Sequence, residues 1–137
     1  MTKNVIVKIE GYQSGTTEGI KTKAPGIYSL LNGRHYIQYS EKLPESNVIV
    51  RNTIKIGETQ VVLSKKIKGN SQMVFDLEEV TQTSYQTPYG NLTFDIKTSS
   101  ITLKETPDQI ELTMDYSLSA ESNHVSDNNI KITILPK

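Results

Sequence analysis

The stretch GIYSLLNGRHYIQYS, residues 26–40, contains the signal that decides the fold. Asn32-Gly33 stands between two runs rich in apolar and aromatic residues, and both of these residues tolerate the positive φ of a type I′ turn. With these two as the loop of a hairpin, Tyr28 faces Ile37 on the opposite strand. The same register gathers a set of side chains on one face, which we expect to be buried: Tyr28, Leu30, His35, Ile37 and Tyr39.

The alternation of apolar and polar residues continues on both sides of this hairpin. It is present at Val5, Val7 and Ile9, and its longest clean run extends over 110–118. Fifteen isoleucines, nine valines and fifteen threonines stand against two alanines, a composition that favours a pleated surface over helices. We therefore predict an all-β protein, a single antiparallel and mostly up-and-down barrel of about eight to ten strands that forms one domain, residues 1–137. The polar segment at 121–129 is expected to be a loop.

Charge and residue usage exclude several classes of function. Fifteen basic and fifteen acidic residues cancel, so the sequence predicts neither a nucleic-acid partner nor a membrane partner. The first residues alternate and carry charges, so we expect no signal peptide or spanning helix and a cytoplasmic location. The absence of cysteine excludes thiol chemistry and cysteine metal sites. We predict no metal and no cofactor.

Several motifs resemble the YwiB-like proteins of Gram-positive bacteria, a family of unknown function with a calycin-like, lipocalin-related barrel. They are the hairpin at 26–41, TIKIGETQVVLSKK at 53–66, SQMVF at 71–75, YQTPYG at 85–90 and DYSL at 115–118. The likeness extends over essentially the whole chain and implies a bacterial protein with a lipocalin-like fold. This sequence departs from the family's pattern at Asp76-Leu77-Glu78-Glu79, where the family tends to have a turn containing glycine.

The favoured function is the non-enzymatic binding of a small, partly apolar molecule, because a barrel of about eight strands can enclose one ligand. The alternative is a structural or interaction module with a filled core, which leaves a homodimer open. We expect the lining of a ligand site among residues with large side chains at inward positions or at the mouth: Tyr28, Tyr39, Met73, Phe75, Tyr85, Tyr89, Phe94, Met114 and Tyr116. Arg51 and Asp115 would supply polar contacts if they faced the barrel, although strand alternation favours the solvent for Asp115.

An enzyme of unknown reaction ranks last, and no catalytic residue is predicted. The sequence contains no nucleophile elbow and no phosphate-binding loop. His35 lies beside the hairpin turn, where packing or a cross-strand contact is the expected role. His124 and Asp127 are spaced to pair as an acid and a base, but a solvated polar turn explains them as well.

Overall fold

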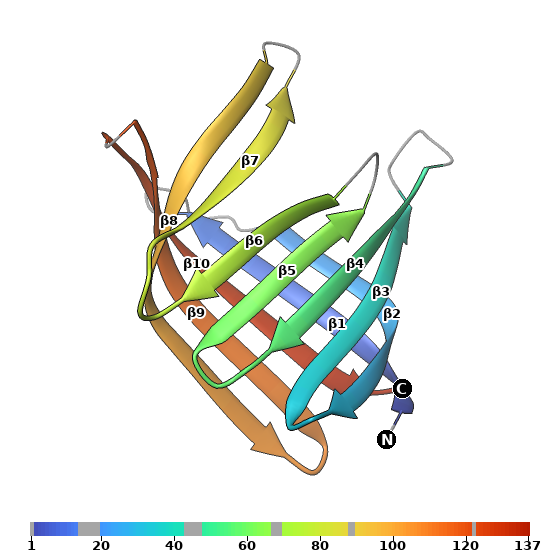
Figure 1. The fold of residues 1–137 in the computed structure, drawn as a ribbon. Helices are drawn as coiled ribbons and strands as arrows, with labels where there is room; N and C mark the ends of the chain where they lie inside the picture. The colour runs from blue at the N-terminus through green and yellow to red at the C-terminus, as the bar shows by residue number, and fades with distance from the viewer. Residues whose placement is uncertain (1, 14–19, 43–47, 67–69, 88–89, 122) are drawn as a thin grey trace.

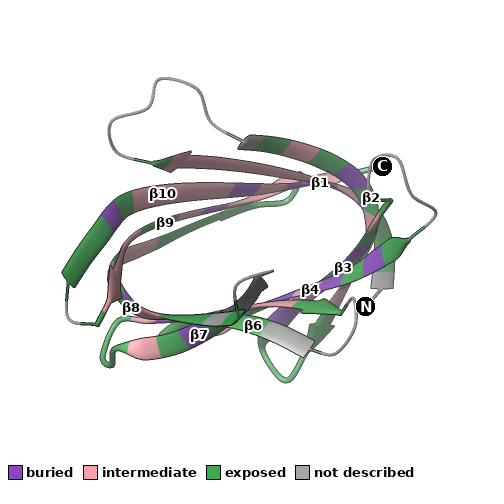
Figure 2. Ribbon diagram, turned by 90° about the horizontal axis from the view of Figure 1, so that it is seen from above, coloured by how far each residue is buried: buried purple, intermediate pink, exposed green. Residues whose placement is uncertain are grey.

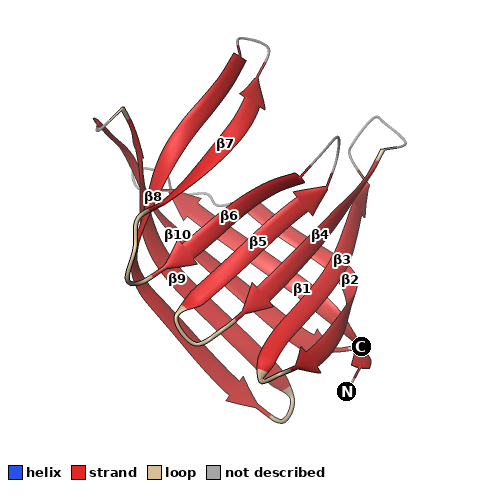
Figure 3. Cartoon of the chain, in the orientation of Figure 1, coloured by secondary structure: helices blue, strands red, loops and turns tan. Residues whose placement is uncertain are grey.

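The computed structural model describes residues 2–13, 20–42, 48–66, 70–87, 90–121 and 123–137, and this part of the chain is built from strands and turns (Figure 3). The strands, labelled in Figure 1, are β1 Thr2–Gln13, β2 Ile20–Leu31, β3 Arg34–Lys42, β4 Ile49–Ile56, β5 Gln60–Lys66, β6 Asn70–Asp76, β7 Thr81–Thr87, β8 Gly90–Thr106, β9 Gln109–Ala120 and β10 Asn123–Pro136.

The strands form a single ten-stranded sheet that rolls into a nearly closed barrel. Their order is β6-β5-β4-β3-β2-β1-β10-β9-β8-β7, and every hydrogen-bonded pair is antiparallel. Neighbours in the sheet are therefore neighbours in the chain, except where β1 pairs with β10. This arrangement confirms the predicted all-β, antiparallel and up-and-down barrel.

The hairpin of β2 and β3 adopts the predicted register. Leu31 pairs with Arg34 and Tyr28 pairs with Ile37. Asn32 has a φ of 52° and Gly33 a φ of 76°, the left-handed backbone that a type I′ turn requires. The turn therefore fixes which face of each strand points into the barrel.

The barrel is not closed by a backbone ladder, because β6 and β7 lie at the two ends of the sheet order. Threonine side chains join them instead. The Thr81 hydroxyl donates to the Val74 carbonyl, and the Thr83 hydroxyl donates to the Gln72 carbonyl at 2.8 Å. Beyond this seam the end of β7 and the beginning of β8 diverge from β6 (Figure 1). At this seam side chains therefore replace the missing backbone bonds.

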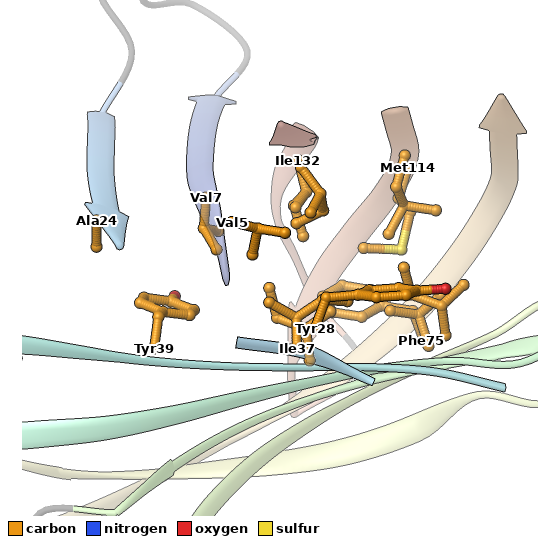
Figure 4. Close-up of a cluster of buried hydrophobic side chains, with 14 of the residues drawn as sticks. Val5, Val7, Ala24, Tyr28, Ile37, Tyr39, Phe75, Met114 and Ile132 are labelled. Carbon is orange, nitrogen blue, oxygen red and sulfur yellow. The ribbon is translucent and has the colours of Figure 1, made fainter. Parts of the chain in front are cut away.

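The core fills the middle of the barrel. Viewed from above, the buried positions line the inner surface of a flattened ring (Figure 2). Side chains from β1 and from β9 and β10 meet those from β3 and β6 across it (Figure 4). The cluster consists of Val5, Val7, Ala24, Tyr28, Ile37, Tyr39, Ile54, Ile56, Val61, Phe75, Ile96, Leu112, Met114, Ile132 and Ile134.

One expectation about secondary structure was wrong. The polar segment at 121–129 is not a loop, because β10 begins at Asn123 and pairs with β9 through most of that segment. A register shift between His124 and Ser126 lets the polar run stay in the sheet. Backbone bonds to β9 therefore override the low β-propensity of these residues.

Candidate functional site

Polar side chains converge at the lower end of the barrel, drawn at the bottom of Figure 1, where the β2–β3 and β8–β9 turns lie. The Tyr28 hydroxyl lies 2.6 Å from His35 Nδ1, and His35 Nε2 lies 2.7 Å from Glu105 Oε1. A carboxylate only accepts, so Nε2 carries a proton, and in the neutral ring Nδ1 accepts from the tyrosine. We call Tyr28, His35 and Glu105 the polar chain.

Tyr28 and Glu105, the two ends of the polar chain, border a cavity of about 190 Å³. Strand alternation turns residues of β1, β2, β8, β9 and β10 toward the barrel axis at this end, and their side chains form its wall. Val5, Ile110 and Ile134 give it apolar surface, while Glu105 and Lys3 give it charge. The Lys3 ammonium also lies 5.7 Å from the centre of the Tyr28 ring. An apolar floor with a few convergent polar groups is the usual form of a small-molecule site.

The order of hydroxyl, imidazole and carboxylate is also that of a catalytic triad. The chemistry of the tyrosine does not fit a nucleophile. Burial raises the pKa of the Tyr28 hydroxyl, and the negative charge of Glu105 raises it further. A phenol whose pKa is raised stays protonated at neutral pH, so the polar chain acts as a set of fixed hydrogen bonds.

The inward-facing residues predicted to line a ligand site are mostly part of the packed core. Phe75 and Met114 have no exposed surface, and Tyr28 and Tyr39 are each 7% exposed. Tyr116 and Met73 pack against the cluster, and the Tyr116 ring meets that of Phe75 edge to face at 4.8 Å. Of these residues, only Tyr28 contributes to the wall of the lower cavity.

The remaining predicted lining residues come from the hairpin of β7 and β8. Phe94 lies half-buried on β8. Tyr85 pairs with Leu92 in the ladder, and its side chain is outside the description. Tyr89 lies outside the described residues.

The two predicted polar contacts do not face the barrel interior. Arg51 is exposed on β4 between the buried Val50 and Asn52, so alternation turns it outward. Asp115 is exposed on β9 and accepts hydrogen bonds from Ser100 at 2.7 Å and Asn129 at 2.8 Å. Neither residue can reach a molecule enclosed by the barrel.

His124 and Asp127 do come together, with Nε2 2.9 Å from Oδ1. Both side chains are more than half exposed, so water screens the pair. His35 makes the expected contact within its hairpin, but its bond to Glu105, 70 residues away, has no signal in the sequence. Among the described residues there is no cluster of three or more histidine and carboxylate groups that would hold a metal, and no helix fit to cross a membrane.

The fold and this site define an antiparallel barrel with a packed centre and a polar mouth. The chain belongs to the family described as a domain of unknown function (DUF1934), whose model matches residues 5–132. It is similar in structure to the ywiB protein from Bacillus subtilis, with a TM-score of 0.77 and 19% identity over 99% of this chain and 92% of that one. Comparison with curated proteins gives no match. The resemblance to the YwiB-like family is thereby confirmed.

Proposed function

We propose that this protein binds a small, partly apolar molecule at the lower end of the barrel. The observation that carries the proposal is the cavity of about 190 Å³ in which the polar chain meets the apolar side chains of Ile110 and Ile134. An apolar protein cavity of about 150 Å³ is known to bind benzene, so this one suits a single ring. Of the two places expected from the sequence, the barrel interior and its mouth, we propose the mouth.

The charges at the cavity indicate the polar group of the ligand. Glu105 and Asp108 contribute carboxylates and Lys3 contributes one ammonium. Carboxylates accept hydrogen bonds, and the excess of negative charge favours a donor on the ligand. A ring that carries an amine fits these groups better than a ring that carries a carboxylate.

We propose binding without catalysis. The Tyr28 hydroxyl is held by His35, and its raised pKa keeps it protonated. His35 in turn has a partner on each ring nitrogen. The Tyr28 hydroxyl next to His35 thus stays a hydrogen-bond donor, and we expect the polar chain to orient a ligand.

A titration of ¹⁵N-labelled protein with benzylamine tests this proposal, with benzoate as the matched anion. We expect benzylamine to shift the amide signals of Tyr28, Glu105 and Ile110, and benzoate to have a weaker effect. Ile110→Phe should fill the cavity and abolish the shifts. Leu103→Phe, on the neighbouring strand but away from the cavity wall, should preserve them. Shifts that are unchanged by Ile110→Phe would refute the site.

A second proposal is an interaction module, which the packed core supports because it leaves the barrel centre little room for a ligand. Large apolar side chains are exposed near the turns and loops, among them Leu31 at 54% and Ile49 at 61%. Such surface is what a partner or a second copy would cover. Light scattering at increasing concentration distinguishes the two cases, because a stable dimer supports this role and a monomer at all concentrations argues against self-association.

A further inference from the structure

One outer face of the barrel concentrates cations although the chain has no net charge. Strand alternation turns Ile37, Ile54 and Val61 inward, and the positions between them point outward from β3, β4 and β5. The structure describes every outward position of these three strands, and none is Asp or Glu. We call their cations the basic face: Arg34, Lys42, Arg51, Lys55 and Lys66.

Acidic residues occupy outward positions on other strands of the barrel. On β8, β9 and β10 the outward positions include Asp95, Glu111, Asp115 and Asp127. The same strands also carry Lys97, Lys104 and Lys131, so their outward charges are mixed, whereas the outward charges of β3, β4 and β5 are all positive. Local potential, not net charge, determines what a surface attracts.

The sheet register groups the cations of the basic face. Arg51 pairs with Lys66, which puts their Cα atoms roughly 5 Å apart. Lys55 lies four residues further along β4, roughly 13 Å from Arg51, with its ammonium 5.8 Å from the centre of the Tyr36 ring. Like charges so placed repel each other, and Glu58, in the turn after β4, offsets part of this charge beside Arg34 and Lys55.

Two hollows lie along this face, one near Arg51 and Lys66 and the other near Arg34 and Lys55. The first, of about 730 Å³, is bordered by Arg51 and Lys66 together with the polar side chains of Gln38, Thr53 and Ser64. The second, of about 700 Å³, is bordered by Arg34, Tyr36 and Lys55 and by the acidic Glu58. Most of the strand residues in the two linings, among them Gln38, Arg51 and Lys55, stand at outward positions of β1 to β5, so the hollows lie on the outside of the barrel.

We propose that the basic face binds single-stranded nucleic acid. Arg34 and Arg51 present planar guanidinium groups that match phosphate oxygens, and Lys55 and Lys66 add point charges. Tyr36 supplies an aromatic ring between the two groups of cations, and bases stack on such rings without regard to sequence.

The hydroxyl and amide groups in the first hollow are also suited to contact nucleic acid. Gln38, Thr53 and Ser64 form a row across three paired strands. Such side chains bond to phosphate and sugar oxygens or to base edges. An acidic peptide would use the cations but would gain nothing from the Tyr36 ring as a stacking surface. From the net charge of zero we expected no nucleic-acid partner. A net charge sums over the whole chain and does not show where the cations gather.

Fluorescence anisotropy with a labelled twelve-nucleotide oligouridine tests the proposal on the full chain. We expect binding at 25 mM salt and a log–log salt slope of about −2.8 if four phosphates are neutralised. Arg51→Glu combined with Lys66→Glu should weaken binding at least tenfold, and the milder Arg51→Gln with Lys66→Gln should give a smaller loss in the same direction. Tyr36→Leu should weaken binding with the salt slope unchanged.

The matched control is Lys97→Glu combined with Lys104→Glu, which makes the same change of charge on β8. We expect this control to bind like the parent protein. Absence of oligouridine binding at 25 mM salt would overturn the proposal, as would an equal loss in the control pair. Displacement of the oligonucleotide by a lower concentration of a ten-residue polyglutamate peptide would assign the face to an acidic protein instead.

Discussion

At the scale of single residues, Gly26 shows how closely two strands of the barrel approach. It lies in β2, pairs with Tyr39 on β3 and with Val5 on β1, and is half-buried. A Cβ added there would lie 2.8 Å from the Gln38 carbonyl oxygen and 3.0 Å from a Val7 methyl group. The backbone oxygen cannot move aside, so only glycine fits without a shift of the sheet.

We predict that Gly26→Ala lowers the free energy of unfolding by about 1–3 kcal/mol, the usual cost of overpacking. Urea denaturation followed by circular dichroism measures it. Gly11→Ala is the matched control, because a Cβ at Gly11 in β1 meets no atom within 4 Å. Alanine at position 11 lowers the entropy of the unfolded chain, so Gly11→Ala should be as stable as the parent protein or slightly more stable. Equal destabilisation by both changes would contradict this account.

Asp115 makes stability depend on pH. Its hydrogen bonds from Asn129 and Ser100 hold its pKa below the usual value of 3.8. A carboxyl whose pKa is lower in the folded state stabilises the fold above the unfolded pKa, and this contribution is lost as the pH falls through the folded pKa. We predict that Asp115→Asn is less stable than the parent at pH 7 and that the gap narrows below about pH 4. Denaturation at several pH values tests this, and a gap that is constant down to pH 2 would disprove it.

At the scale of elements, the polar chain connects the β2–β3 hairpin to β8 across the lower end. His35 is 8% exposed, and its Nε2 is bonded to the Glu105 carboxylate. Removal of that carboxylate would leave the buried Nε2 without this partner. We predict that Glu105→Ala lowers stability by roughly 1–3 kcal/mol, the cost of an unsatisfied buried group. Glu105→Gln retains an acceptor oxygen and should lose less. Thermal unfolding of both variants measures the difference, and equal losses would show that the bond contributes nothing.

The seam between β6 and β7 depends on side chains where other strand pairs use backbone bonds. Thr83 is 3% exposed and donates to the Gln72 carbonyl. Thr83→Val keeps the shape and removes the donor, so we predict a loss of about 0.5–1.5 kcal/mol and faster amide exchange in β7. Thr113→Val in β9, a strand with a ladder on both sides, is the control and should leave exchange in β7 unchanged. Unchanged exchange in the Thr83 variant would show that the seam is held by other contacts.

At the scale of the whole molecule, local signals predicted the fold and distant contacts formed the site. Asn32-Gly33 set the hairpin register because a tight turn leaves one way to pair. The bond between His35 and Glu105 depends on how the sheet rolls up, which brings together residues 70 positions apart. The basic face had no signal in the composition, because a count over the whole chain does not show that the outward charges of β3, β4 and β5 are all positive. Strand alternation shows which side chains point into the barrel, but it does not show whether their volumes fill it. The filled centre could therefore not be predicted from the sequence.

The central claim is that the barrel is filled at its centre and takes a small molecule at its lower end. Intermolecular nuclear Overhauser effects between benzylamine and the methyl groups of the protein test it most directly. We expect contacts from the ligand to Val5, Ile110 and Ile134, which border the cavity. Contacts to Ile37 or Met114, which have no exposed surface in the packed centre, would contradict the claim, as would the absence of any contact at the lower end.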